Sequence, residues 1–303
     1  MYLIETNKLC KKYGNHLVID NVDMHIPEGS IYGFVGENGS GKTTIMRLLT
    51  GLASPTSGSF TLFGAKNTES KIYEARKEIS AIVEAVSFVP SMTAIDNIIY
   101  QEKYLGISLT DEERNNLLKS VHLDKVGKKK VKNFSLGMKQ RLGIALAMMK
   151  KPRLMFLDEP MNGLDPQGIV ELRDLLVELN QKQGLTVLIS SHILSELEKI
   201  ATIYGFISHG RLLEEITVEE LQEKCEKSLV IKVENLAEAE AAIKDIGIKR
   251  YKVYPNGDIA IYDEIDIGDF VAKINKKKIK ILSIRSVDES VEDYYLNLIK
   301  KGA

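Results

Sequence analysis

The 303-residue chain has few cysteines and almost no net charge. Its two cysteines, Cys10 and Cys225, lie far apart and have neither the spacing of a metal site nor that of a disulfide framework, which favours a reducing compartment. The formal net charge of -1 provides no overall field that would attract nucleic acid or an anionic membrane. Nucleic acid is therefore not an expected partner.

The chain also lacks a long apolar run. A membrane-spanning helix needs roughly 20 consecutive apolar residues, and the longest candidate, Leu142 to Met149, is far too short. The first residues, Met1 to Glu5, lack the charged and apolar regions of a secretion signal. With 44% hydrophobic and 27% charged residues, the composition is that of a folded soluble protein. The sequence thus predicts a cytoplasmic protein.

One segment matches the phosphate-loop pattern G-x-x-x-x-G-K-[ST] in full. It follows a strand-like run, Ile31 to Val35, and leads into a helical pattern. Glycines let backbone N–H groups turn toward phosphate oxygens, and the start of a helix adds partial positive charge. Lys42 is expected to reach the terminal phosphates, and the hydroxyl of Thr43 to hold Mg²⁺. The residues expected to contact the nucleotide here are Gly36, Glu37, Asn38, Gly39, Ser40, Gly41, Lys42, Thr43 and Thr44.

A second strand-like run ends in two acids. Leu154 to Leu157 is followed by Asp158 and Glu159, and ligands bind at the carboxyl ends of strands in such sheets. Asp158 is expected to hold Mg²⁺ through water, and Glu159 to orient or deprotonate an attacking water. Alone, such a pair is as often a helix cap, but the phosphate loop favours the catalytic interpretation.

The segment Asn133 to Arg141 precedes a helix rich in Ala, Leu and Met, and here the chain resembles the ATP-binding cassette (ABC) family. The usual signature of that family is L-S-G-G-Q. Ser135 and Gly137 retain the two positions that offer donors to a γ-phosphate at a helix N-terminus. Leu136 and Met138 replace the first Gly and the Gln. For Ser135 by itself, the alternative is an ordinary helix cap.

The resemblance implies roles for three further residues. His192 follows the run Thr186 to Ile189 and resembles the switch histidine that senses the γ-phosphate. Asp165 lies in a segment that resembles the D-loop, which contacts the opposing subunit. Tyr13 resembles the aromatic residue that stacks on adenine, although a half-buried strand tyrosine is the alternative. The expected catalytic residues are therefore Lys42, Glu159 and His192.

Glu84 indicates a subgroup. It stands where ABC ATPases usually have glutamine, and a carboxylate there is able to ligate Mg²⁺ or bind water. Together with Leu136 and Met138, it resembles the ATPases of bacitracin-resistance and lantibiotic-immunity transporters, which also have an appended C-terminal module. The expected metal ligands are Thr43, Asp158 and Glu84.

The resemblance also implies the fold. Residues 1–225 should form an α/β P-loop NTPase (ABC ATPase) core with an antiparallel β subdomain and an α-helical subdomain at about residues 90–150. Residues 226–303 show a β-α-β-β-α-β order, with a hairpin signal at Pro255-Asn256-Gly257. That order predicts a small α+β ferredoxin-like C-terminal module. The residues leave the role of this module open.

The function that the resemblance implies is that of the ATP-hydrolysing subunit of an ABC exporter. Two copies would form a homodimer around ATP and drive a separate transmembrane permease, which would hold the protein at the inner face of the cell membrane. Antimicrobial peptides or drugs are the implied cargo. A soluble regulatory ABC-type ATPase and a P-loop phosphotransferase are the alternatives. In the homodimer, Lys42, Thr43, Asp158, Glu84, Glu159 and His192 of one copy would face Ser135 and Gly137 of the other.

Overall fold

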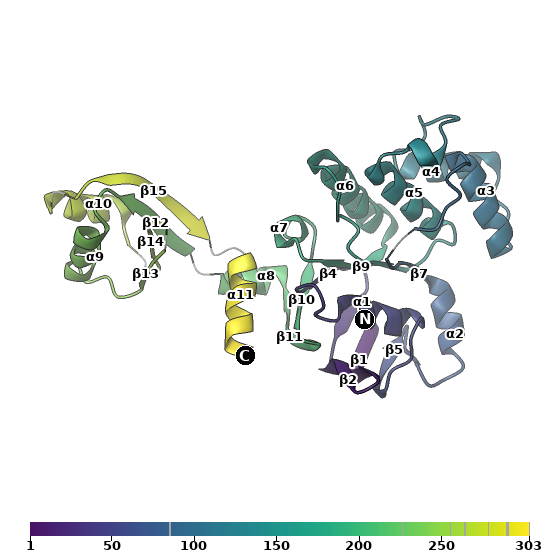
Figure 1. Cartoon of the computed structure of the whole chain (residues 1–303), viewed down its shortest axis with the longest axis horizontal. Helices are drawn as coiled ribbons and strands as arrows, with labels where there is room; N and C mark the ends of the chain where they lie inside the picture. The colour runs from purple at the N-terminus through teal and green to yellow at the C-terminus, as the bar shows by residue number, and fades with distance from the viewer. Residues whose placement is uncertain are drawn as a thin grey trace. The chain divides into compact units, whose positions relative to one another are not determined.

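The structure, a computed structural model, describes residues 1–84, 86–225, 227–254, 256–263, 265–277, 279–288 and 291–302. The chain divides into two compact units, Met1–Val218 and Glu219–Lys300 (Figure 1). This division falls at the start of α8 (Val218–Lys224), whereas the predicted domain boundary follows Cys225. Pro255 of the predicted hairpin, and Glu226 and Ala303 at the ends of the predicted second domain, lie outside the described residues.

A six-stranded sheet forms the centre of the first unit, in the order β11-β10-β4-β9-β8-β7. All neighbours are parallel except β10 and β11, which form an antiparallel pair at one edge. Strands β4, β8 and β9 are buried along their whole length, as apolar runs covered on both faces should be. The strands are β4 (Ile31–Val35), β7 (Ile79–Ile82), β8 (Leu154–Leu157), β9 (Thr186–Ser191), β10 (Ile203–Ser208) and β11 (Arg211–Thr217).

A second, antiparallel sheet has the order β2-β1-β5-β6, and β3 also pairs with β1. It packs against α1 (Lys42–Thr50). The buried side chains of α1 share one apolar core with both sheets, including Phe60 from β5 and Phe156 from β8. This packing fixes the first turn of α1 beside the carboxyl end of β4. The strands are β1 (Tyr2–Tyr13), β2 (His16–Val22), β3 (His25–Pro27), β5 (Ser57–Leu62) and β6 (Ala65–Lys66).

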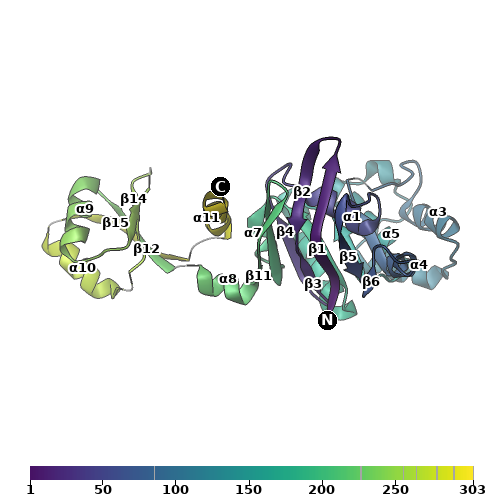
Figure 2. The same ribbon diagram turned by 90° about the horizontal axis from the view of Figure 1, so that it is seen from below.

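Helices α3, α4 and α5 form a group that Figures 1 and 2 both show, with α5 against β7 and α6. Capping boxes begin α3 and α4, in which the Thr93 and Thr110 hydroxyls accept from backbone N–H groups. The group confirms the predicted helical subdomain. Besides α1, the helices of this unit are α2 (Ile72–Ala75), α3 (Ala94–Leu105), α4 (Asp111–Ser120), α5 (Leu136–Met148), α6 (Pro166–Gln183) and α7 (Leu194–Leu197), with 3-10 turns at Arg76–Glu78 and Val131–Asn133.

The second unit has the predicted β-α-β-β-α-β order. Its antiparallel sheet runs β13-β14-β12-β15, and α9 and α10 contribute Ile243 and Phe270 to its apolar core. Across the described parts of the whole chain, no helix is both long and apolar enough to cross a membrane. The elements are β12 (Lys227–Val233), α9 (Leu236–Asp245), β13 (Tyr251–Val253), β14 (Asp258–Ile261), α10 (Ile267–Lys276), β15 (Ile281–Asp288) and α11 (Val291–Gly302).

Candidate functional site

The loop between β4 and α1 has a backbone that requires glycine. Gly39 and Gly41 have φ angles of 82° and 111°, in the region that side chains other than glycine disfavour. A Cβ atom on Gly36 would lie 2.5 Å from Ser40 Oγ, and one on Gly41 would lie 2.5 Å from Ile19 Cδ1. A side chain at either position would collide with these atoms, so both positions require glycine, as in a loop that wraps closely around phosphates.

Lys42 lies under this loop and is only 5% exposed. Its Nζ donates to the carbonyl oxygens of Gly36, at 2.6 Å, and Glu37, at 3.2 Å, and lies 3.3 Å from Glu159 Oε1. The Ser40 hydroxyl is buried and has no hydrogen-bond partner among the described residues. A buried cation and an unpartnered hydroxyl in one loop suit a bound phosphate, since a buried polar group without a partner is costly.

Asp158 connects the ends of two strands to α1. Its Oδ2 accepts from the Thr43 hydroxyl at 2.7 Å, and its Oδ1 accepts from the Ser190 hydroxyl at 2.7 Å. Ser190 Oγ in turn accepts from the backbone N–H of Glu159 at 2.8 Å. Because β8 and β9 are neighbouring parallel strands, their carboxyl ends bring Asp158 and Ser190 together at the first turn of α1.

Glu159 lies between a lysine and a histidine. Its Oε2 is 2.8 Å from His192 Nδ1, while its Oε1 is near Lys42 Nζ but makes no hydrogen bond with suitable geometry to any described residue. The backbone of Glu159 has a φ of 49°, a conformation uncommon outside glycine that directs the residue away from the strand. A carboxylate with one buried, unbonded oxygen is suited to accept a proton from water.

The predicted signature and D-loop residues lie side by side. Ser135 caps α5 by accepting from Met138 N at 3.2 Å, and Asp165 caps α6 by accepting from Gly168 N at 3.0 Å. A Cβ on Gly137 would lie 3.6 Å from Gly168 Cα. The starts of the two helices are therefore in close contact, and no described contact joins Ser135 or Gly137 to the phosphate loop of the same chain.

Two predicted residues have other partners in the structure. Tyr13 ends β1 with an exposed ring, and Lys11 Nζ lies 4.8 Å from the centre of that ring. Glu84 follows β7, and its carboxylate pairs with Arg47 of α1. No described contact links Glu84 to Asp158. Of the remaining predicted residues, Glu37 and Asn38 are exposed in the loop, and Thr44 lies in the first turn of α1.

The chemistry of the donors fits ATP with Mg²⁺ rather than a metal alone. Within the described ranges, no group of three or more His, Cys, Asp or Glu side chains is arranged to hold a metal ion. Thr43 and Asp158 supply one hydroxyl and one carboxylate, and Mg²⁺ takes its other ligands from water and substrate phosphates when the protein offers so few. Of the three predicted metal ligands, Thr43 and Asp158 are thus in contact, while Glu84 is held elsewhere.

Sequence reasoning overlooked Ser190 and Arg47. Ser190 bridges Asp158 and the backbone of Glu159, and Arg47 holds Glu84. Ser190 is the last residue but one of β9, just before His192, so its position near a strand end was visible in the sequence. Arg47 lies one helix turn after Thr43, where i and i+4 residues share a face, but nothing in the sequence indicated its partner.

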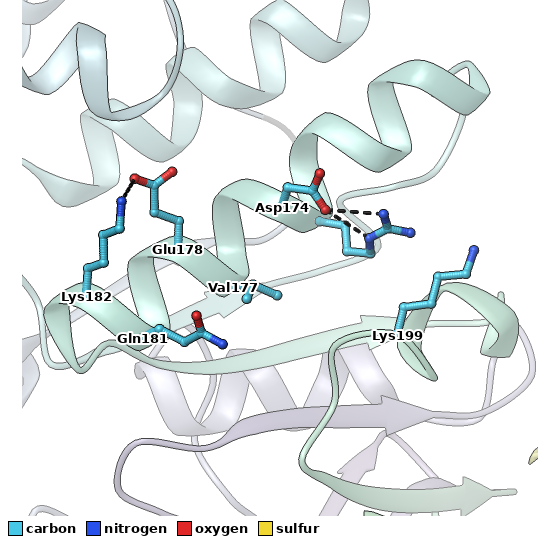
Figure 3. A pocket seen from close by; sticks show the side chains of 7 residues that line it. Asp174, Val177, Glu178, Gln181, Lys182 and Lys199 are labelled. Carbon is cyan, nitrogen blue, oxygen red and sulfur yellow. Dashed lines mark hydrogen bonds and ion pairs between the residues drawn. The ribbon is translucent and has the colours of Figure 1, made fainter.

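A hollow of about 610 Å³ along α6 contains none of the predicted site residues (Figure 3). Lys182 pairs with Glu178 at 2.7 Å, as Figure 3 shows, and Arg173 pairs with Asp174. Neighbouring opposite charges along a helix are typical of a solvated face. We therefore assign no ligand to this hollow.

The fold and the site together define a P-loop ATPase. The chain belongs to the ABC transporter family, as one of its ATP-binding proteins, and the family model described as "ABC transporter" matches residues 19–162. It is 39% identical over 305 residues to the bacitracin transport ATP-binding protein BcrA of Bacillus licheniformis, with 99% of this chain and 98% of that protein covered.

Two further comparisons agree. The lantibiotic transport ATP-binding protein SrtF of Streptococcus pyogenes is 43% identical over 211 residues, which cover 70% of this chain and 89% of SrtF. The structure of cbiO1 from Clostridium perfringens, part of the transporter complex cbiONQ, aligns with a TM-score of 0.65 over 81% of this chain and 97% of that one. At 23% identity, this last likeness shows the fold alone. The chain is an ATP-hydrolysing subunit that powers a transporter.

Proposed function

We propose that this chain drives export of antimicrobial peptides or drugs through a separate transmembrane permease. The cargo is suggested by the names of BcrA and SrtF, which refer to bacitracin and lantibiotic transport. The variant residues Glu84, Leu136 and Met138 resemble the same subgroup. The permease would hold the protein at the inner face of the cell membrane.

The observation that supports the catalytic roles is the position of Glu159 between Lys42 and His192. In the proposed reaction Glu159 accepts a proton from the attacking water, and His192 keeps the carboxylate oriented. Lys42 is positioned to stabilise charge on the terminal phosphate. Mg²⁺ would neutralise phosphate oxygens when bound, with Thr43 and Asp158 as its protein donors. Tyr13 would stack on adenine.

A second copy of the chain would complete the site. Ser135 is exposed at the start of α5, and its partners in the described structure belong to its own helix. The N-terminus of α5 therefore remains available to a phosphate. We propose a homodimer in which ATP lies between the phosphate loop of one copy and Ser135 and Gly137 of the other, with Asp165 at the contact between copies.

A hollow of about 650 Å³ beside the edge strand β7 is a candidate binding site for the permease. Its lining includes Val86 to Val89 and, from α3, Tyr100 and Tyr104, whose exposed fractions are 54% and 81%. Exposed aromatic side chains around a groove are typical of a protein interface. We propose that a cytoplasmic helix of the permease binds here. In this scheme residues 1–225 carry the ATPase, and residues 226–303 are an accessory domain.

The test is to purify the tagged Glu159→Gln protein with ATP from gently solubilised native membranes and to identify its companions. A polytopic membrane protein in stoichiometric amount supports the proposal. A clean dimer without a membrane partner would instead support the regulatory ABC-type ATPase. Phosphate release without any acceptor separates both from a phosphotransferase.

A further inference from the structure

The α1 helix contacts the ends of two neighbouring strands through side chains one turn apart. Thr43 binds Asp158, which follows β8, and Arg47 pairs with Glu84, which follows β7. Strands β7 and β8 are parallel neighbours, and the N–H of Asp158 donates to the Ile82 carbonyl at 2.9 Å. Side chains at i and i+4 of a helix are about 5–6 Å apart at Cβ. Glu84 is therefore held beside α1 by a residue that lies one helix turn from Thr43.

The Arg47–Glu84 pair is open to exchange. The side chains of Arg47 and Glu84 are 37% and 60% exposed, and an exposed ion pair is weak enough to be replaced by a stronger partner. Glu84 has a φ of 71°, a conformation that costs energy for a residue with a side chain. The structure thus holds Glu84 through a charge contact that a glutamine at the same position could not form.

Val86, close to Glu84 in the sequence, contacts the helix that begins at Ser135. Val86 follows shortly after Glu84 and packs on Gly143 of α5, where an added Cβ would lie 2.5 Å from Val86 Cγ2. Val86 also lines the hollow proposed for the permease. Glu84 therefore contacts α1, while Val86 contacts the hollow and the helix that begins at Ser135.

We infer that Arg47 is a positioning residue that holds Glu84 away from the metal donors until Mg²⁺ and ATP arrive. When Mg²⁺ is bound by Thr43 and Asp158, Glu84 would leave Arg47 and turn toward the metal, to which it would add a carboxylate oxygen. This inference rests on the proposed function, because it takes Glu84 as a metal ligand. It makes the strength of the Arg47 contact a determinant of the Mg²⁺ concentration at which Glu84 changes partner.

The first measurement uses full-length protein without nucleotide. Arg47→Gln should increase backbone hydrogen exchange in residues 82–89 relative to the parent, because the charge contact that holds Glu84 is gone. The matched control is Arg153→Gln, which removes another half-exposed Arg–Glu pair, with Glu28, and should leave this segment unchanged. Equal exchange in the parent and Arg47→Gln would overturn the inference.

The second measurement is a Mg²⁺ titration of the binding of a fluorescent ATP analogue, in the Glu159→Gln background. Arg47→Gln should lower the Mg²⁺ midpoint by about threefold, the scale of a partly exposed ion pair, and Arg47→Lys should stay near the parent. In the Glu84→Gln background the effect of Arg47→Gln should vanish. A shift that persists there would assign Arg47 a role independent of Glu84, such as stabilising the end of α1.

The two proposals fail separately. A missing membrane partner for the Glu159→Gln protein would refute the export function and leave the Mg²⁺ midpoints as found. Identical midpoints with a stoichiometric permease would refute only the role of Arg47.

Discussion

The two units of the chain use charged side chains in different ways. In the first unit, the site residues join distant parts of the sequence: Thr43 binds Asp158, and Glu159 binds His192. In the second unit, described pairs such as Lys277–Asp245 lie on the surface, with 40% and 69% of the side chains exposed. Exposed pairs contribute little to stability. The proposed catalytic residues therefore form the partly buried network of the first unit, while charged pairs such as Lys277–Asp245 form part of the solvated surface of the second unit.

The largest expected effect comes from comparing a carboxylate of the site, Glu159, with a surface carboxylate of the second unit, Glu240. Glu159→Gln should reduce ATP hydrolysis by about 10²–10⁴-fold, because it removes the proton acceptor and keeps the shape of the side chain. ATP binding should persist, together with a dimer that is stable in ATP. Glu240→Gln, on the surface of α9, is the control and should hydrolyse at the parental rate. Near-parental turnover by Glu159→Gln would refute the assigned base.

The second prediction tests whether the units are independent. Ile231 is fully buried in the core of the module, and Ile231→Ala should lower the free energy of unfolding of that unit by about 2–5 kcal/mol. Ile231→Val should cost only about 0.5–1.5 kcal/mol. Denaturation followed by circular dichroism measures the loss, and ATP hydrolysis below the transition should be unchanged. A parallel loss of hydrolysis would show that the module supports the site.

The third prediction concerns Ser190, which supports two acids at once. Ser190→Ala should lower hydrolysis by about tenfold, because Asp158 and the backbone of Glu159 each lose a hydrogen-bond partner. Steady-state ATPase assays over a range of Mg²⁺ concentrations measure the effect. The control is Ser283→Ala, at an exposed position of β15. If both variants behave alike, the bridge has no catalytic consequence.

The smallest effect concerns a buried ion pair without a catalytic role, Glu102 with Arg114 in the helical subdomain. Two hydrogen bonds from Arg114, at 2.7 and 2.8 Å, lower the pKa of Glu102 below its ordinary value of 4.5. The stabilisation is therefore complete above pH 4.5 and disappears as the pH falls through the lowered pKa.

Glu102→Gln should accordingly lower the melting temperature by a few degrees at neutral pH. The difference from the parent should shrink in acid, as thermal melts over a pH series would reveal. Glu112→Gln, on the exposed face of α4, should show no such pH dependence. A difference that is constant with pH would mean that packing, and not charge, explains the loss.

Local patterns in the sequence were sufficient for much of the fold and the site. The spacing of Gly36, Gly41 and Lys42 predicted the loop, and the acids after an apolar run predicted Asp158 and Glu159. These features depend on residues within one turn or strand end, where the backbone alone fixes the geometry. The β-α-β-β-α-β order of the module was visible for the same reason.

The contacts that the sequence did not reveal all join separate strands and helices. Ser190 reaches Asp158 because β9 lies beside β8, and Arg47 reaches Glu84 because α1 packs against the sheet at the ends of β7 and β8. Glu84 was expected at the metal donors and is instead paired with Arg47, so its metal role remains a prediction.

The sequence by itself determined the class of chemistry, because a phosphate loop followed by strand-end acids is encoded in neighbouring residues. Only the tertiary structure decided which side chains contact the same carboxylate, as Thr43 and Ser190 contact that of Asp158. Strand order and helix packing set distances between residues far apart in the chain, and hydrogen bonds and ion pairs form only when those distances close to about 3 Å.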